Sequence, residues 1–92
     1  MIGSFLDRDA ELIFDGARSR RYAGIERIIE RKLRVLQAAV NLQDLAIPPG
    51  NRLEALRGDR EGQHSIRVNS QFRICFRWER SHAYEIEIAD YH

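Results

Sequence analysis

The last three residues of the sequence, Asp90-Tyr91-His92, carry side chains that can move protons. An imidazole titrates near neutral pH and can therefore act as a base or an acid. A phenol can donate a proton or stack on a nucleobase. Cleavage of RNA by its own 2′-hydroxyl needs a base for that hydroxyl, cations that offset the developing phosphorane charge, and an acid for the leaving 5′-oxygen. The alternative is that these residues fray and carry no function.

Arginines that could supply the cations are concentrated in the second half of the chain. Fourteen of the fifteen basic residues are Arg, whose planar fork binds phosphate with two hydrogen bonds. The net charge is only +1, yet six arginines stand against three acids in the stretch 57–80. The six are Arg57, Arg60, Arg67, Arg73, Arg77 and Arg80. We therefore expect an anion-binding face here, with an ordinary solvated surface as the alternative.

Alternating residues predict the strands that position these arginines. The stretches 64–68, 72–78 and 83–89 alternate apolar and polar residues, and 52–56 reads as a shorter strand. If 69–71 form a turn, Ile66 faces Ile74 and Arg67 lies directly opposite Arg73. Like charges opposite each other destabilise a sheet, and a bound phosphate backbone would relieve the repulsion.

The following hairpin offers a purely structural explanation of the polar face. Pairing Trp78 with Tyr84 places Arg77 opposite Glu85, and Cys75 opposite Glu87. The polar face would then be solvated and laced with weak ion pairs. The apolar face would carry the residues Phe72, Ile74, Phe76, Trp78, Tyr84, Ile86 and Ile88.

The first half of the chain predicts two helices. Asp9 could cap a short helix that reaches 14–15 and stops at Gly16. An amphipathic pattern then starts at Ile25 and predicts a helix of about 16 residues that stops near Asn41, before the prolines at 48–49. Two helices followed by an antiparallel meander indicate an α+β fold, in which both helices cover the apolar face of the sheet.

Composition excludes several other classes of protein. We expect one domain over residues 1–92, because the chain is too short for two cores. No apolar run approaches the roughly 20 residues that span a bilayer, and we see no signal peptide. The single Cys75 suits a reducing cytoplasm, and the three histidines lack metal-ligand spacing. We therefore expect neither a metal nor a cofactor, and no membrane partner.

Several blocks of the sequence resemble the HigB toxins, the plasmid-maintenance killer proteins of the RelE/ParE superfamily. These blocks are the stretch 53–62, the stretch 65–69, the stretch 72–78 and the closing Asp90-Tyr91-His92. The opening Met1-Ile2 and Ser4-Phe5 also fit, so the resemblance covers nearly the whole chain. It implies a RelE-like small domain in which two N-terminal helices pack on a curved antiparallel sheet, with a first strand over 2–6.

The resemblance also implies an activity and partners. Toxins of this family cleave mRNA in the ribosomal A site without a metal. A helix-turn-helix antitoxin (HigA-like) neutralises them, and operator DNA is bound only through that complex. Two alternatives stay open: a ParE-like gyrase inhibitor with the same fold, and a catalytically inert relic that only binds its antitoxin.

Site residues carry over from the family position by position. Arg73 corresponds to a phosphate-contacting arginine, Arg57 replaces a basic residue that is often Lys, and Asp90-Tyr91-His92 match the terminal active-site residues. The roles implied are His92 as general acid or base, Arg73 and Arg57 as charge stabilisers, Tyr91 as a positioning or stacking group, and Asp90 as the residue that orients the terminal segment. Some members have a catalytic His where this chain has Glu54, which makes Glu54 an alternative base. The predicted polar face adds Arg67 and Arg77 as RNA-binding candidates.

Overall fold

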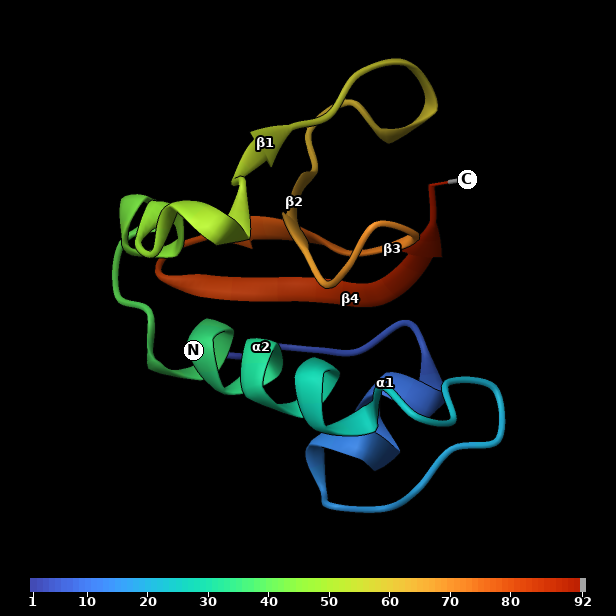
Figure 1. Cartoon of the computed structure of the whole chain (residues 1–92). Coiled ribbons are helices and arrows are strands. Elements are labelled where there is room, and N and C mark those ends of the chain that lie inside the picture. Colours follow the sequence, from blue (N-terminus) through green and yellow to red (C-terminus); the bar gives the residue numbers. More distant parts are fainter. Residues whose placement is uncertain (92) are drawn as a thin grey trace.

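The structure, a computed structural model that describes residues 1–91, has two layers (Figure 1). Helices α1 (Arg8–Phe14) and α2 (Glu26–Ala38) form one layer. The other is an antiparallel sheet of four strands in the order β1-β2-β3-β4, with bounds Glu54–Ala55, His64–Arg67, Phe72–Glu79 and His82–Asp90. Short 3-10 helices connect them: η1 (Leu42–Ala46), η2 (Pro49–Asn51) and η3 (Gly58–Arg60). The predicted α+β class, with two helices on an antiparallel sheet, is confirmed.

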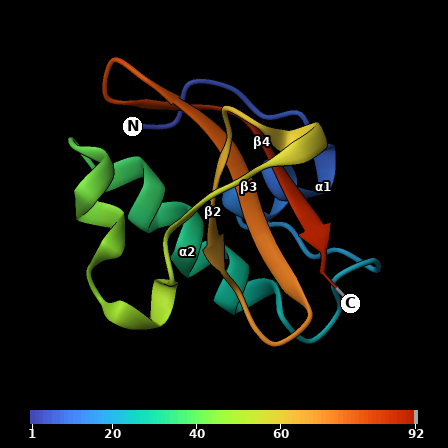
Figure 2. The ribbon, with the colours of Figure 1, turned by 90° about the horizontal axis from the view of Figure 1, so that it is seen from above.

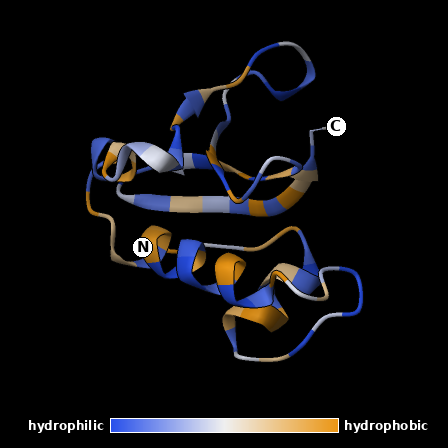
Figure 3. Cartoon of the chain, viewed as in Figure 1, coloured by the Kyte–Doolittle hydropathy of each residue, from blue (hydrophilic) through white to orange (hydrophobic). Residues whose placement is uncertain are grey.

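The hydrophobic core lies between the helices and the sheet. Seen from above, β2, β3 and β4 lie side by side over both helices (Figure 2). Apolar and polar residues alternate along the helices and the longer strands (Figure 3), so α1, α2, β2, β3 and β4 each turn an apolar face inward, whereas both residues of β1 are exposed. The fully buried members of the core include Ile29, Leu33, Leu36, Ile66, Ile74, Phe76 and Ile86. No helix within residues 1–91 is both long and apolar enough to cross a bilayer.

Helix α1 begins two residues earlier than predicted. Its N-cap is Asp7, whose Oδ1 accepts from the backbone N–H groups of Asp9 at 2.9 Å and Ala10 at 3.3 Å. The other carboxylate oxygen of Asp7 accepts from the backbone N–H of Ile88 in β4, at 3.3 Å. Asp9 could cap a helix but could not make this tertiary bond, so contact with the sheet selects Asp7.

Helix α2 ends at Ala38 and not near Asn41 as predicted. The Asp44 carboxylate accepts from the backbone N–H groups of Val40 at 3.0 Å and Asn41 at 2.9 Å, which starts η1 in a new direction. The N-terminal ammonium of Met1 donates to the carbonyl of Ala39 at 2.9 Å. Both contacts hold the backbone after Ala38 in an extended conformation.

The predicted register of the first hairpin is confirmed, whereas that of the second is wrong by one residue at the end next to its turn. Arg67 lies opposite Arg73, and Ile66 opposite Ile74. In the second hairpin Cys75 lies opposite Glu87 as predicted, but Trp78 pairs with Ala83 instead of Tyr84. A bulge causes the shift: Glu85 has a positive φ of 54° and its backbone N–H donates to Ser4 Oγ at 2.9 Å.

The N-terminal segment does not form the strand expected from the family resemblance. It makes two isolated parallel bridges to β4, Ile2 with Ala83 and Phe5 with Ile86. Strand β1 is likewise shorter than the predicted 52–56, because Arg52 adopts a left-handed conformation with φ of 46°. Both segments follow the sheet without extending it as full strands.

Candidate functional site

The outer face of the sheet, defined as the face turned away from α1 and α2, holds Arg73 in a fixed position. Arg73 Nε donates to Ser65 Oγ at 2.7 Å, and Nη2 donates to the Arg52 carbonyl at 2.6 Å. The same Nη2 lies 3.4 Å from Glu54 Oε1, and only 11% of the Arg73 side chain is exposed. Glu54 therefore neutralises Arg73 within the folded protein, opposite the like-charged Arg67.

A groove of about 460 Å³ opens beside β1 and brings three of the predicted site residues together. Its lining residues are Glu54, Ala55, Leu56, Arg57, Arg60 and Tyr91. Arg57 is exposed and makes no ion pair with any residue between 1 and 91. The Arg73 guanidinium carbon lies 5.9 Å from the centre of the Tyr91 ring, which places Arg73 next to the groove as well. Of the described residues that line the groove, Arg57 is therefore the cation without an ion pair that could bind an anion.

Tyr91 is tied to the turn before β3 through its own backbone N–H and through the preceding residue, Asp90. Its N–H donates to the Gln71 carbonyl at 2.7 Å, and the Gln71 side-chain amide donates to the Asp90 carboxylate at 3.1 Å. The phenol oxygen lies 4.0 Å from Cys75 Sγ, while 46% of the residue is exposed. Burial raises the pKa of the Tyr91 phenol, and the neighbouring Cys75 adds to this. The hydroxyl therefore stays protonated near neutral pH and can donate a hydrogen bond.

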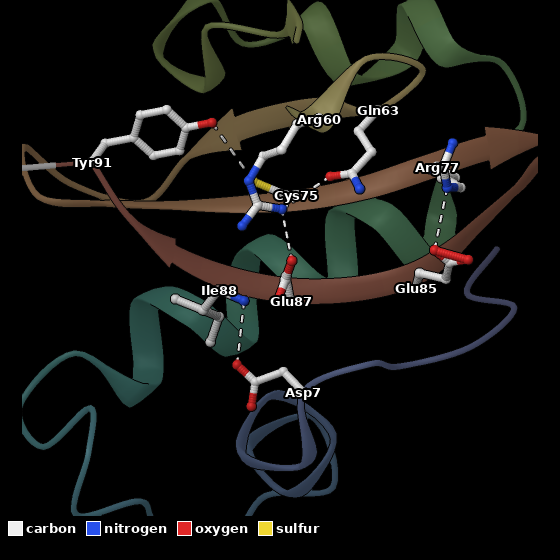
Figure 4. A network of polar contacts seen from close by, with 9 residues as sticks. All are labelled: Asp7, Arg60, Gln63, Cys75, Arg77, Glu85, Glu87, Ile88 and Tyr91. Carbon is white, nitrogen blue, oxygen red and sulfur yellow. Dashed lines mark hydrogen bonds and ion pairs between the residues drawn. The ribbon is translucent and has the colours of Figure 1, made fainter. Parts of the chain in front are cut away.

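Arg60 also lines the groove, although the sequence analysis named it only as one of the six clustered arginines and not as a site residue. Its Nη1 donates to Glu87 Oε1 at 2.6 Å and to Gln63 Oε1 at 3.1 Å, so it ties η3 to β4 (Figure 4). The bond to Glu87 raises the pKa of Arg60. Arg60 was counted among the clustered arginines, but a loop has no periodicity from which to place its side chain. Strand alternation put Glu87 on the polar face, and that was the only signal for this pair.

Cys75 lies on the outer face but is fully buried, in contrast to the predicted solvated face. Tyr91 and Arg60 cover it, as Figure 4 shows, and burial raises the pKa of its thiol. A protonated, inaccessible thiol is a packing group and a poor nucleophile.

Two candidates among the described residues, Arg77 and Arg67, lie apart from the groove. Arg77 Nε donates to Glu85 Oε2 at 3.2 Å, so the predicted pair forms despite the bulge, in a different pocket that Tyr84 and Glu85 also line. Arg67 does not line the groove. His92 lies outside the described residues. Within residues 1–91, no group of three His, Cys, Asp or Glu side chains could hold a metal ion.

Comparison with known proteins shows that the sequence of this chain is similar to toxins of the HigB type. Residues 5–92 match the family model described as the RelE-like toxin of the type II toxin–antitoxin system HigB. A Vibrio cholerae protein called toxin HigB-1 is 43% identical over 76 residues, which cover 80% of each chain. A Proteus vulgaris protein called endoribonuclease HigB is 36% identical over the full length of both chains. The fold matches the YoeB–YefM complex from Staphylococcus aureus with a TM-score of 0.61 at 15% identity, over 100% of this chain and 98% of that one.

Proposed function

The chain belongs to the HigB-like family of RelE-like toxins from type II toxin–antitoxin systems, and on that premise we propose that it is an endoribonuclease that cleaves mRNA in the ribosomal A site without a metal. The observation that carries the proposal is the groove beside β1, where Glu54, Arg57 and Tyr91 converge next to the fixed Arg73. The name of the Proteus vulgaris relative, endoribonuclease HigB, supports the same reaction.

The reaction needs only groups of the protein and of the RNA. A base removes the proton of the 2′-hydroxyl, the 2′-oxygen attacks phosphorus, and the bond from phosphorus to the 5′-oxygen breaks as an acid protonates that oxygen. The products are a 2′,3′-cyclic phosphate and a 5′-hydroxyl. Two candidates share the proton transfers: Glu54, which lines the groove with 59% of its side chain exposed, and His92, the residue after Tyr91 in the sequence.

Cations and donors of the groove would stabilise the phosphorane. Arg57, which makes no ion pair within residues 1–91, would bind a non-bridging phosphate oxygen. The guanidinium of Arg73 is paired with Glu54 in the free protein, and its charge would act on the phosphorane once Glu54, as the base, takes up the proton of the 2′-hydroxyl. The protonated Tyr91 hydroxyl can donate to the RNA or leave its ring to stack on a base. Asp90 and Gln71 hold Tyr91 in place.

The family assignment also supports partners for the proposed toxin. The groove is open, so we assign to the ribosome the task of aligning the 2′-hydroxyl with the bond that breaks. The neutralising partner in this proposal is a HigA-like antitoxin with a helix-turn-helix domain, and the complex of the two binds operator DNA. Both act in the cytoplasm, where the translated message is found.

The test is inducible expression of the chain in a bacterial host, followed by mapping of the 5′ ends of cellular mRNA. Wild type is compared with Arg57→Ala and with the control Arg80→Ala, which removes an exposed arginine outside the groove. We expect new ends inside translated codons for wild type and control, and their loss in Arg57→Ala. Growth arrest with intact mRNA and DNA-damage signalling would instead indicate a ParE-like gyrase inhibitor, and harmless expression would indicate an antitoxin-binding relic.

A further inference from the structure

A second group of cations lies at the edge of β2, beyond the end of β1. Strand β1 pairs with β2 only opposite His64 and Ser65, so it does not extend as far as Arg67, which is half-buried. Lys32 of α2 donates to Asn51 of η2, and η2 contacts β2, so the Lys32 ammonium is held beside this edge. Burial lowers the pKa of the Lys32 ammonium, and the guanidiniums of Arg31 and Arg67 lower it further. Arg31, Lys32 and Arg67 are referred to below as the edge cluster.

The charges of the edge cluster are not balanced by carboxylates. None of the three side chains makes an ion pair within the described part of the chain, residues 1–91. Lys32 donates instead to the side-chain carbonyl of Asn51, a neutral group. Asn51 is fully buried, and its own amide donates to the Leu45 carbonyl at 3.2 Å. This arrangement fixes the ammonium of Lys32 in place without cancelling its charge.

Like charges held together lower the stability of the fold, and a bound anion removes that cost. Arg73 differs from the edge cluster, because it already has an ion pair with Glu54 and a hydrogen bond to the Ser65 hydroxyl. Arg67 lies opposite Arg73 in the sheet and shares its outer face, whereas Arg31 and Lys32 come from α2, in the other layer. A strand of RNA that follows the outer face past Arg73 would reach Arg67 next, at the edge of β2 that Lys32 approaches through Asn51.

We propose that the edge cluster is a second phosphate-binding site for RNA, distinct from the groove in which the cleaved bond would lie. The inference rests on the proposed function, since it extends the path of the same ligand. The shared chemistry is the RNA phosphate backbone, which can come from the message or from ribosomal RNA. Continuity with the groove favours RNA over an acidic segment of a protein partner.

The test compares two triple variants that remove the same charge. The first variant replaces the edge cluster with glutamine: Arg31→Gln/Lys32→Gln/Arg67→Gln. The control replaces three exposed arginines that also lack ion pairs within the described residues: Arg8→Gln/Arg20→Gln/Arg80→Gln. Affinity for a fluorescent single-stranded RNA oligonucleotide is measured by anisotropy as a function of salt, and affinity for ribosomes without message by sedimentation. Each phosphate contact on single strands contributes about 0.7 to the slope of log affinity against log salt, so we expect the slope to fall by about 2 for the edge cluster alone. The single variant Arg31→Gln, at an exposed position, should lower it by about 0.7 and serves if the triple variant does not fold.

Each outcome decides the question. A loss with the oligonucleotide assigns the site to the message, and a loss only with ribosomes assigns it to ribosomal RNA. Equal slopes for cluster and control variants refute the inference alone, and so does selective loss of antitoxin binding. If the wild type binds neither form of RNA, the proposed function fails together with this inference.

Discussion

Replacing Arg73 should lower both the stability and the activity of the protein, whereas replacing Arg57 should lower its activity alone. Arg73→Ala removes two short charge-assisted hydrogen bonds and leaves the buried Ser65 hydroxyl without that donor. Each such bond contributes about 1.5 kcal/mol, so the free energy of unfolding should fall by about 3 kcal/mol. For a domain of this size that corresponds to a decrease in Tm of about 12 to 24 °C. Arg57 makes no ion pair within residues 1–91, so Arg57→Ala should change stability by less than about 0.5 kcal/mol.

The two variants should therefore lose activity for different reasons. We expect Arg57→Ala to retain the wild-type Tm and to cleave message in a purified translation reaction about 100-fold more slowly, the effect of removing one donor to a developing oxyanion. Arg73→Ala should lose both stability and activity. Urea unfolding followed by circular dichroism supplies the stabilities, with Arg80→Ala as the control. If Arg73→Ala unfolds within about 0.5 kcal/mol of wild type, the bonds described here contribute little and Arg73 is a free ligand for phosphate.

Three further predictions concern stability. Arg60→Gln and Glu87→Gln should each lower the free energy of unfolding by about 1 kcal/mol. A double-mutant cycle should give a coupling energy of about 0.5 to 1 kcal/mol, because both side chains are partly solvated. A coupling energy of zero would show that the pair does not tie η3 to β4. In Gly3→Ala the new Cβ would lie 2.4 Å from Tyr84 Cε1, so the free energy of unfolding should fall by roughly 1 to 3 kcal/mol, whereas Gly50→Ala, with open space around it, should not show this loss. Burial raises the pKa of the Cys75 thiol and of the Tyr91 phenol, and that of Tyr22 to about 12, so the folded chain keeps protons that the unfolded chain releases. Stability should therefore be intact below pH 9 and decline as the pH rises from there towards 12, and unfolding free energies that do not change over this interval would contradict the assignment.

Local patterns predicted those parts of the fold that local rules determine. The short turn at 69–71 set the register of β2 against β3, because alternation leaves one arrangement with both apolar faces inward. The choice between Asp7 and Asp9 as a helix cap was different, since either residue suits the position. A bond from Asp7 to β4 decided it, and no local pattern reports such a contact.

In the second hairpin, too, a contact distant in the sequence overrides the local pattern. The stretch 83–89 alternates well, and it predicted that Tyr84 faces the core. Tyr84 instead lies next to Gly3 of the N-terminal segment, and the left-handed backbone of Glu85 shifts the pairing by one residue. The cause is the N-terminal segment itself, which bonds to β4 through Ser4, eighty-one residues away from its partner Glu85.

The excess positive charge of the second half could be counted from the sequence but not located there. Three of its six arginines are paired in the structure: Arg60 with Glu87, Arg73 with Glu54, and Arg77 with Glu85. Among the described residues, the other three have no such partner. Of these, Arg57 lines the groove and Arg67 belongs to the edge cluster, whereas Arg80 lies in the turn between β3 and β4. The charge left over for an anionic ligand thus lies at Arg57 and Arg67. Of the four arginines predicted to bind RNA, we therefore expect Arg57 and Arg67, more than the paired Arg73 and Arg77, to dominate the salt dependence of RNA binding.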